Sequence, residues 1–372
     1  MRIFQILEKS QFNTGSVHQM FQAAEGLIRR SHDVTIISKQ DSTMAQKARE
    51  AGIDYHDLPF RNEADIATIR GLSRLVSEKK PDVIHVHKGL SHTLALVATW
   101  RNPVGAFVVN RGVSFDLSIW NRGKYRTRRV DRIVTVCEQI RQVVIRTGKV
   151  PPDKVQVVYA GTDVALFDPA RHDREAFRRE KAIPSSDFLF MQVGVRDWKG
   201  WMELVDSFSD VARQKKNVRL ALIAYNSDEQ RQEVERYAEA AGVGGLVLPV
   251  EYRSDMARVL ASSDCVVDAS WGGTGITGTI REAMSLSKPS VATDCGGNVE
   301  LLSSPDLGWL VPPKDRQALT SAMLDVMASP DRSREIGARA RRHVVDGFSR
   351  EARLDRLEGL YKAVLNGKGL PA

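Results

Sequence analysis

The chain has 372 residues, of which 42% are hydrophobic and 27% charged, and its formal net charge is +8. This length allows two domains with separate cores, and the composition excludes a disordered, collagen-like or coiled-coil chain. No apolar run reaches the roughly 20 residues of a membrane-spanning helix, and the first residues lack the pattern of a signal peptide. The three cysteines lie too far apart for a disulfide framework or a metal site. We therefore expect a soluble, cytoplasmic protein.

The positive charge is concentrated in the first half of the chain. Residues 1–165 carry 25 Lys and Arg against 16 Asp and Glu, and residues 101–150 alone carry 11 against 3. A basic half beside a nearly neutral half indicates that one domain faces an anionic partner. Nucleic acid, acidic lipid and a phosphorylated substrate all fit this pattern, and charge alone does not choose among them.

Short apolar runs alternate with amphipathic stretches of helical length along nearly the whole chain. The runs predict strands at residues 2–7, 34–38, 83–86, 106–109, 133–136, 155–159, 188–193, 219–224, 245–249, 265–269, 290–293 and 309–311. Apolar residues at helical spacing predict helices that include residues 17–30, 64–80, 281–287 and 330–345. Strands that are apolar nearly throughout are typical of parallel sheets covered by helices. Six strand–helix units in each half predict two doubly wound α/β domains.

The strand pattern stops after residues 159–163, and a polar, charged segment continues to residue 186. We place the domain boundary near residue 165. Because doubly wound folds bind ligands beyond the carboxyl ends of their strands, we expect the ligand in a cleft between the two domains.

The most informative segment runs from residue 271 to residue 284, with four glycines between a predicted strand and a predicted helix. Such a loop turns tightly and points backbone N–H groups at a ligand, and the helix N-terminus behind it favours a phosphate. Glu282 is expected in the first helical turn, where its carboxylate can accept two hydrogen bonds from a vicinal diol such as a ribose. The alternative is an acidic residue that stabilises only the helix.

A second loop of this kind follows the next strand, with Gly296 and Gly297 before Asn298, which is expected to cap the helix after it. Two neighbouring loops of this type favour a diphosphate over a single phosphate. Arg196 and Lys199 follow the strand at residues 188–193, where they can neutralise a diphosphate leaving group. The alternative for both is that they are solvated loop charges.

In their order and spacing, these segments resemble the retaining GT-B glycosyltransferases of family four over nearly the full chain. The matching segments are residues 15–16, 81–87, 130–137, 161–167, 196–200, 275–284, 288–289, 296–300 and 347–365. The resemblance implies an N-terminal, acceptor-side Rossmann-like domain of residues 1–165 plus a C-terminal helix at 350–372. A donor-binding Rossmann-like domain would comprise residues 166–349. The implied reaction moves a sugar from a UDP- or GDP-sugar to a glycan or glycolipid, as in polysaccharide or lipopolysaccharide biosynthesis, with no other cofactor.

The resemblance also implies roles for individual residues. Arg196 and Lys199 match the pair that grips the donor diphosphate, and Glu282 matches the residue that holds the donor ribose. The other residues implied at the donor are Gly15, Ser16, Thr274, Gly275, Ile276, Thr277, Gly296 and Gly297.

Two positions depart from the family pattern. Thr274 replaces a Glu that normally contacts the donor sugar, and residues 110–112 lack the usual His. On the acceptor side we predict Arg111, His18 and His87, with His85 facing the opposite side of its strand. The departures leave two alternatives open, a catalytically silent nucleotide-sugar binding protein and a GT-B sugar-nucleotide epimerase.

No residue cluster has the spacing of metal ligands, so we expect basic residues and helix dipoles to hold the diphosphate without a metal. The segment 120–132 groups Lys and Arg residues around Trp120 and Tyr125. This composition suits an anionic membrane surface, and no nucleic-acid module accompanies it. We predict that the chain from Arg122 to Arg132 contacts the inner face of the membrane or a phosphorylated glycolipid, and that no nucleic acid binds. The alternative is a solvated helix face.

Overall fold

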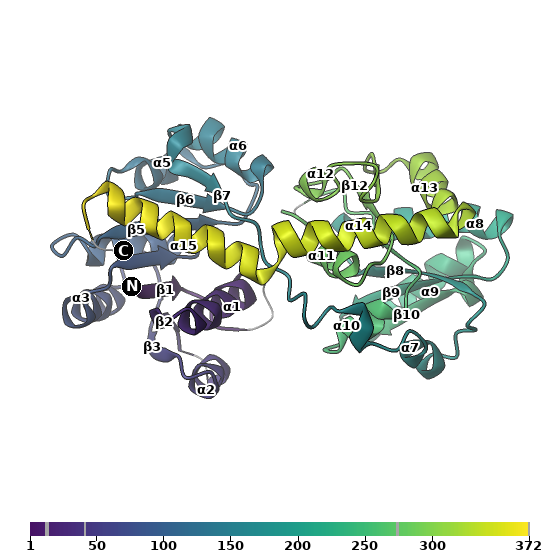
Figure 1. Cartoon of the computed structure of the whole chain (residues 1–372), viewed down its shortest axis with the longest axis horizontal. Helices are drawn as coiled ribbons and strands as arrows, with labels where there is room; N and C mark the ends of the chain where they lie inside the picture. The colour runs from purple at the N-terminus through teal and green to yellow at the C-terminus, as the bar shows by residue number, and fades with distance from the viewer. Residues whose placement is uncertain (12–14, 41, 273–274, 371–372) are drawn as a thin grey trace. The chain divides into compact units, whose positions relative to one another are not determined.

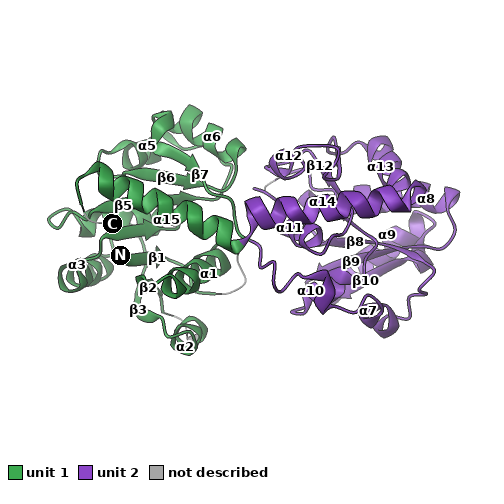
Figure 2. Cartoon of the chain, in the orientation of Figure 1, with its two compact units in different colours: residues 1–161, 350–372 green, residues 162–349 purple. Residues whose placement is uncertain are grey.

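A computed structural model describes residues 1–11, 15–40, 42–272 and 275–370. The chain folds into two compact units (Figure 2). Unit 1 comprises Met1–Gly161 and Arg350–Ala372, and unit 2 comprises Thr162–Ser349.

Unit 1 contains a seven-stranded parallel sheet in the order β3-β2-β1-β4-β5-β6-β7 (Figure 1). Its elements are β1 (Arg2–Leu7), α1 (Gly15–Arg29), β2 (Asp33–Lys39), α2 (Ser42–Glu50), β3 (Asp54–Leu58), α3 (Ile66–Lys79), β4 (Val83–Val86), α4 (Gly89–Ala98), β5 (Ala106–Arg111), α5 (Ile119–Arg126), β6 (Arg132–Thr135), α6 (Glu138–Gly148), the 3-10 turn η1 (Pro152–Lys154), β7 (Val155–Val157) and the returning helix α15 (Arg350–Gly367).

The returning helix α15 is part of the core of unit 1. Leu354, Leu357 and Tyr361 of α15 are buried in one apolar cluster with residues of α1 and the central strands. The two helices pack so closely that a Cβ atom at Gly26 of α1 would lie 2.3 Å from Leu354 Cδ1. Burial of this apolar face fixes the C-terminal helix on unit 1.

Unit 2 contains a six-stranded parallel sheet in the order β10-β9-β8-β11-β12-β13. Its elements are η2 (Pro169–Arg171), α7 (Glu175–Glu180), β8 (Phe188–Val193), η3 (Asp197–Lys199), α8 (Trp201–Gln214), β9 (Val218–Tyr225), α9 (Asp228–Ala240), η4 (Gly244–Leu246), β10 (Val247–Glu251), α10 (Met256–Ala261), β11 (Cys265–Asp268), α11 (Gly278–Ser285), β12 (Ser290–Thr293), α12 (Asn298–Leu301), β13 (Trp309–Val311), α13 (Arg316–Ala328) and α14 (Pro330–Phe348).

The prediction of two doubly wound, Rossmann-like α/β domains is confirmed, but the element count for the first half is wrong. Unit 1 has a seventh strand, β3, at the edge of its sheet. Asp54 and Asp57 of β3 are exposed, and none of its residues is fully buried. An edge strand whose residues are all at least partly exposed therefore has no apolar run by which the sequence could reveal it. The polar segment after residue 163 likewise contains a short helix, α7.

Candidate active site

The carboxyl ends of β8 and β11 form the topological switch point of unit 2. The two strands are neighbours in the sheet, with β9 on the outer side of β8 and β12 on the outer side of β11. Open α/β sheets bind ligands at such a point. The candidate site is therefore carried by the segments that follow these strands, residues 194–200 on one side and residues 269–272 and 275–277 on the other.

These two loops touch each other closely at a glycine. Gly200 has a φ of +66°, and a Cβ atom there would lie 2.1 Å from Ala269 O, so a side chain would collide with backbone. The Trp271 N–H also donates a hydrogen bond to Trp198 O at 2.9 Å. The loop after β8 is therefore held against the loop after β11.

A buried carboxylate lies between the loops. Asp268, the last residue of β11, is 2% exposed. Its carboxylate accepts hydrogen bonds from Ser270 Oγ at 2.7 Å and Thr277 Oγ1 at 2.8 Å. Asn298 Nδ2 donates to it at 3.2 Å, and Lys199 Nζ lies 3.2 Å from Oδ1. A buried charge is stable only when it is paired and hydrogen-bonded. The partners of this carboxylate come from the segments that follow β8, β11 and β12, so the side chain connects the three segments.

The two predicted diphosphate-binding cations have different surroundings. The Lys199 side chain is 13% exposed and is oriented by its ion pair with Asp268. Its Nζ also lies 5.2 Å from the centroid of the Trp198 ring, and Gln192 Nε2 donates a hydrogen bond to its backbone oxygen at 3.2 Å. Arg196 is exposed. The protein therefore fixes the position of one cation and leaves the other at the surface.

Asn298 joins the two predicted donor loops, and its expected role as a helix cap is wrong. It is the first residue of α12, and the capping position is Gly297. The Thr277 N–H donates to Asn298 Oδ1 at 3.1 Å, and the Gly297 N–H donates to Gly275 O at 3.3 Å. Gly296 has a φ of +65° in the same loop. The segments 275–277 and 296–297 thus lie together.

Glu282 lies in the second turn of α11 rather than the first, because the helix begins at Gly278. Its side chain is half-buried, and burial raises the pKa of its carboxyl group, an effect that the charge of Arg281 opposes. A half-buried carboxylate can accept hydrogen bonds from a diol, and the ribose role stays a prediction. Ile276 is half-buried, and Thr274 lies outside the described residues.

Two buried histidines lie near the switch point of unit 1, where β1 and β4 are neighbours. The expectation that His85 and His87 face opposite sides is wrong: side chains two residues apart along a strand point to the same face, and the two rings stack with centroids 4.3 Å apart. His87 Nε2 lies 2.5 Å from Gln5 Oε1, and His85 Nδ1 lies 2.6 Å from Tyr361 Oη. Burial lowers the pKa of both rings, that of His85 to about 3. His87 is thus a neutral interior group, 3% exposed.

The remaining unit 1 residues of the predicted site lie on two elements. Gly15 and Ser16 begin α1, and His18 is exposed on the same helix. Arg111 ends β5 and donates a hydrogen bond from Nη2 to Phe115 O. The structure keeps these residues within unit 1, and their roles toward donor and acceptor stay predictions.

Within residues 1–11, 15–40, 42–272 and 275–370, no group of three or more His, Cys, Asp or Glu side chains is placed to hold a metal ion. None of the helices in this described part of the chain is both long and apolar enough to cross a membrane.

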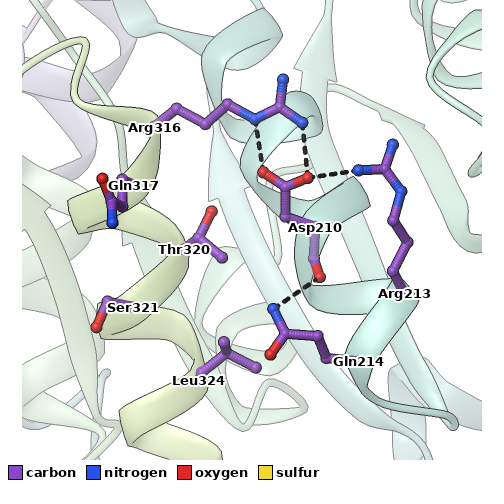
Figure 3. A pocket seen from close by; sticks show the side chains of 8 residues that line it. All are labelled: Asp210, Arg213, Gln214, Arg316, Gln317, Thr320, Ser321 and Leu324. Carbon is purple, nitrogen blue, oxygen red and sulfur yellow. Dashed lines mark hydrogen bonds and ion pairs between the residues drawn. The ribbon is translucent and has the colours of Figure 1, made fainter.

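A groove of about 600 Å³ lies between α8 and α13 and is lined by side chains of these two helices, not by the loops after β8 and β11 (Figure 3). Asp210 in this groove accepts hydrogen bonds from Arg316 Nε at 2.6 Å and Arg213 Nη1 at 2.7 Å. Because these charged side chains pair with one another, the groove is less suited to a diphosphate than the loops around Asp268.

Two family models match the chain. Residues 14–166 match the model described as Glycosyltransferase Family 4, and residues 187–329 match Glycosyl transferases group 1. The chain is a GT-B glycosyltransferase of family four. The two matches follow the two units, and the fold and family predictions are confirmed.

This glycosyltransferase is similar over most of its length to proteins with named activities. It is 21% identical to the UDP-Gal:alpha-D-GlcNAc-diphosphoundecaprenol alpha-1,3-galactosyltransferase of Escherichia coli, covering 80% of this chain and 79% of that protein. It is also 21% identical to the capsular polysaccharide biosynthesis glycosyltransferase CapM of Staphylococcus aureus, covering 98% and 97%. The first of these relatives is named for a galactosyl transfer and the second for polysaccharide biosynthesis.

Solved structures share its fold at low sequence identity. A glycosyltransferase from Rickettsia africae superposes with a TM-score of 0.90 at 19% identity, covering 98% of both chains. Anabaena HepE in complex with UDP superposes with a TM-score of 0.86 at 16% identity, covering 98% of this chain and all of that one.

Proposed function

We propose that this glycosyltransferase moves a sugar from a UDP- or GDP-sugar to a glycan or glycolipid acceptor, with retained configuration and without a metal ion. The observation that carries the proposal is the ion pair between Lys199 and buried Asp268 at the switch point of unit 2, with exposed Arg196 on the same loop. A fixed cation and an exposed one at this point suit a diphosphate. The UDP bound by the similar Anabaena protein supports this ligand class.

In the proposed reaction, the bond between the anomeric carbon and the diphosphate breaks as the acceptor hydroxyl attacks from the same face, and the hydroxyl proton passes to the departing diphosphate. The negative charge that develops on the diphosphate is stabilised by Arg196 and Lys199 and by backbone N–H groups of the loops at 275–277 and 296–297. Cations and amides that are already oriented need no reorganisation during the reaction, and such electrostatic stabilisation is usually the largest catalytic term. Glu282 would hold the donor ribose.

We propose that Gly15 and Ser16 of unit 1 face the donor, and that His18 and Arg111 of the same unit lie on the acceptor side. The E. coli relative acts on a diphosphoundecaprenol-linked sugar, which supports a lipid-linked acceptor here. We further propose that exposed basic residues of the segment from Arg122 to Arg132 face the inner, anionic surface of a membrane that holds such an acceptor.

A thermal-shift panel with UDP, GDP, ADP and CMP tests the donor site. A nucleotide at about 100 times its Kd stabilises a protein by roughly 2.7 kcal/mol, or about 5–10 °C for a domain of this size. We expect one diphosphate to stand out, and its sugar forms are then tested. No shift with any nucleotide at millimolar concentration would contradict the proposal.

Turnover separates the proposed reaction from its alternatives. With the selected nucleotide sugar and a lipid-linked acceptor, we expect nucleotide release, unchanged by EDTA, and an NMR coupling constant that shows retention at the anomeric carbon. Donor conversion with no nucleotide release would identify an epimerase. Binding with no turnover against any acceptor would identify a silent binding protein.

A further inference from the structure

Large apolar side chains are gathered at the surface of unit 1, just before α5 and in its first turn. The exposed fractions are 72% for Phe115, 73% for Ile119 and 95% for Trp120, and Val113 is 47% exposed. Single exposed hydrophobic residues are ordinary on protein surfaces. Four of them within eight residues, two of them aromatic, form an apolar surface that points to a partner.

Buried neighbouring side chains hold this surface in place. Leu117, between the exposed residues, is buried, and its N–H donates to Thr147 Oγ1 at 3.0 Å. A Cβ atom at Gly148 of α6 would lie 2.7 Å from Leu117 Cδ1, so this side chain packs tightly on α6. Tyr125, in the last turn of α5, is also buried and meets the ring of His92 edge-on at 4.9 Å. Anchors on both sides of Ile119 and Trp120 therefore hold these side chains outward.

Cations on α5 lie beside the apolar surface. Arg122 and Arg126 follow Ile119 by three and seven residues, a spacing that places all three on one helix face. Arg126 is exposed and Arg122 half-buried. Asp116 is the acidic residue within this stretch, and its carboxylate lies 3.9 Å from Arg146. The surface thus combines aromatic and aliphatic groups with positive charge.

Other cations of the segment 122–132 hold the helix in place instead. Lys124 Nζ donates to Gly89 O at 3.0 Å and Thr93 Oγ1 at 3.1 Å of α4. Arg129 Nη1 donates to Leu96 O at 2.7 Å. These bonds fix α5 on α4, so the outward-facing surface lies nearer the N-terminus of the segment than the basic residues alone indicate.

We propose that residues 113–126 dock this chain on an anionic phospholipid bilayer, with Phe115, Ile119 and Trp120 among the acyl chains and Arg122 and Arg126 at the lipid phosphates. Amphipathic aromatic rings prefer this interface, and basic residues are attracted to anionic leaflets. The excess of 11 basic over 3 acidic residues at 101–150 matches such a surface in charge. The functional role of this docking rests on the proposed function, because docking would bring the enzyme to a lipid-linked acceptor.

Co-sedimentation of the full chain with vesicles tests the apolar part of this surface. We expect binding to vesicles of 70% phosphatidylcholine and 30% phosphatidylglycerol and little binding to phosphatidylcholine alone. The variant Phe115→Ser/Ile119→Ser/Trp120→Ser should lose at least about tenfold in affinity, since it removes the inserted groups. A matched control, Ile66→Ser/Tyr252→Ser, changes residues that are 60% and 73% exposed elsewhere and should bind like the wild type.

The cations are tested by Arg122→Glu/Arg126→Glu against Arg49→Glu/Arg70→Glu, which changes the net charge equally on α2 and α3. Each basic residue near an anionic surface contributes about a fivefold gain in binding, so the first variant should lose at least about 25-fold and the control much less. Equal losses in both variants would show a diffuse charge effect and overturn the docking surface.

Two further outcomes would also overturn the proposal. One is wild-type binding by the triple serine variant. The other is a wild-type dimer in sedimentation velocity that this variant converts to monomer without a change in vesicle binding, because the surface would then join two copies of the chain. All variants should keep the wild-type melting temperature. If the wild type binds vesicles but its melting temperature does not rise with any nucleotide, only the transferase proposal is contradicted.

Discussion

Replacing Asp268 by Asn is the sharpest test of how the candidate site is built. The substitution keeps the shape of the side chain and removes the charge that faces Lys199 at 3.2 Å. Breaking a buried ion pair costs about 3–5 kcal/mol, because one charge is left without a partner. The Lys199 side chain is 13% exposed, so water relieves part of this cost and we expect the lower value. For a unit of this size, about 3 kcal/mol corresponds to a fall of roughly 6–12 °C in melting temperature.

The assay is thermal unfolding, together with the kcat/KM for the donor. Because Asp268 also orients Lys199 and Thr277, we expect kcat/KM to fall by at least about tenfold, the value of one charged hydrogen bond. The double variant Asp268→Asn/Lys199→Met removes both charges and should regain most of the stability without regaining activity.

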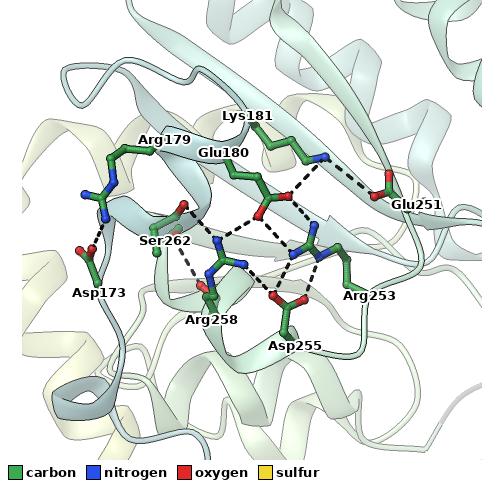
Figure 4. A network of polar contacts seen from close by, with 10 residues as sticks. Asp173, Arg179, Glu180, Lys181, Glu251, Arg253, Asp255, Arg258 and Ser262 are labelled. Carbon is green, nitrogen blue, oxygen red and sulfur yellow. Dashed lines mark hydrogen bonds and ion pairs between the residues drawn. The ribbon is translucent and has the colours of Figure 1, made fainter.

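Asp255 provides a matched control at the surface of unit 2. Its carboxylate also pairs with cations, Arg253 Nε at 2.8 Å and Arg258 Nη1 at 2.9 Å, within the network of Figure 4. Its side chain is 36% exposed, and exposed ion pairs contribute about 0–1 kcal/mol. Asp255→Asn should therefore lower the melting temperature by at most about 4 °C. If Asp268→Asn unfolds within 2 °C of the wild type, burial of this carboxylate does not support the site and our reasoning is refuted.

Two other substitutions test single features of the site. Glu282→Gln should weaken nucleotide binding by about tenfold, because an amide offers a diol one acceptor oxygen instead of two. Burial raises the Glu282 pKa above its ordinary value of 4.5, so the charged form costs stability as pH rises through the raised pKa. The Gln variant should therefore melt no lower than the wild type at pH 7 and lose any advantage below pH 4; a lower melting temperature at pH 7 would show that the carboxylate stabilises the fold. Gly200→Ala should lose several degrees in melting temperature and the nucleotide-induced shift, because its Cβ would meet Ala269 O at 2.1 Å in a left-handed conformation. Gly245→Ala, with open space around the new Cβ, is the control, and equal melting temperatures for the two variants would contradict this account.

The fold could be predicted because its information lies in local patterns. Strands such as β1, β4 and β8 are buried, and their apolar runs marked their bounds without error. The edge strand β3 could not be found this way, since its exposed aspartates break the pattern. The glycine-rich loops could be placed because tight turns require their residue type.

The hydrogen bonds and ion pairs within the site could not be predicted, because they join residues far apart in sequence. Asp268 looked like the end of a strand, and only the fold brings Lys199, 69 residues away, against it. Asn298 was assigned a local role as a cap, whereas its side chain reaches Thr277 in the neighbouring loop. A polar residue at the end of an otherwise apolar strand was the available signal. The prediction that His85 and His87 face opposite sides failed for a different reason, since side chains two residues apart along a strand lie on the same face.

The central claim is that the switch point of unit 2 binds the diphosphate of a sugar nucleotide through Arg196 and Lys199. Calorimetric titration with the best nucleoside diphosphate and with its parent nucleoside tests this most directly. We predict a diphosphate preference that falls by about tenfold or more in Arg196→Ala, the value of a hydrogen bond to a charged group. It should stay unchanged in Arg236→Ala on α9, where another exposed arginine is removed. An equal preference in the wild type and Arg196→Ala would contradict the account.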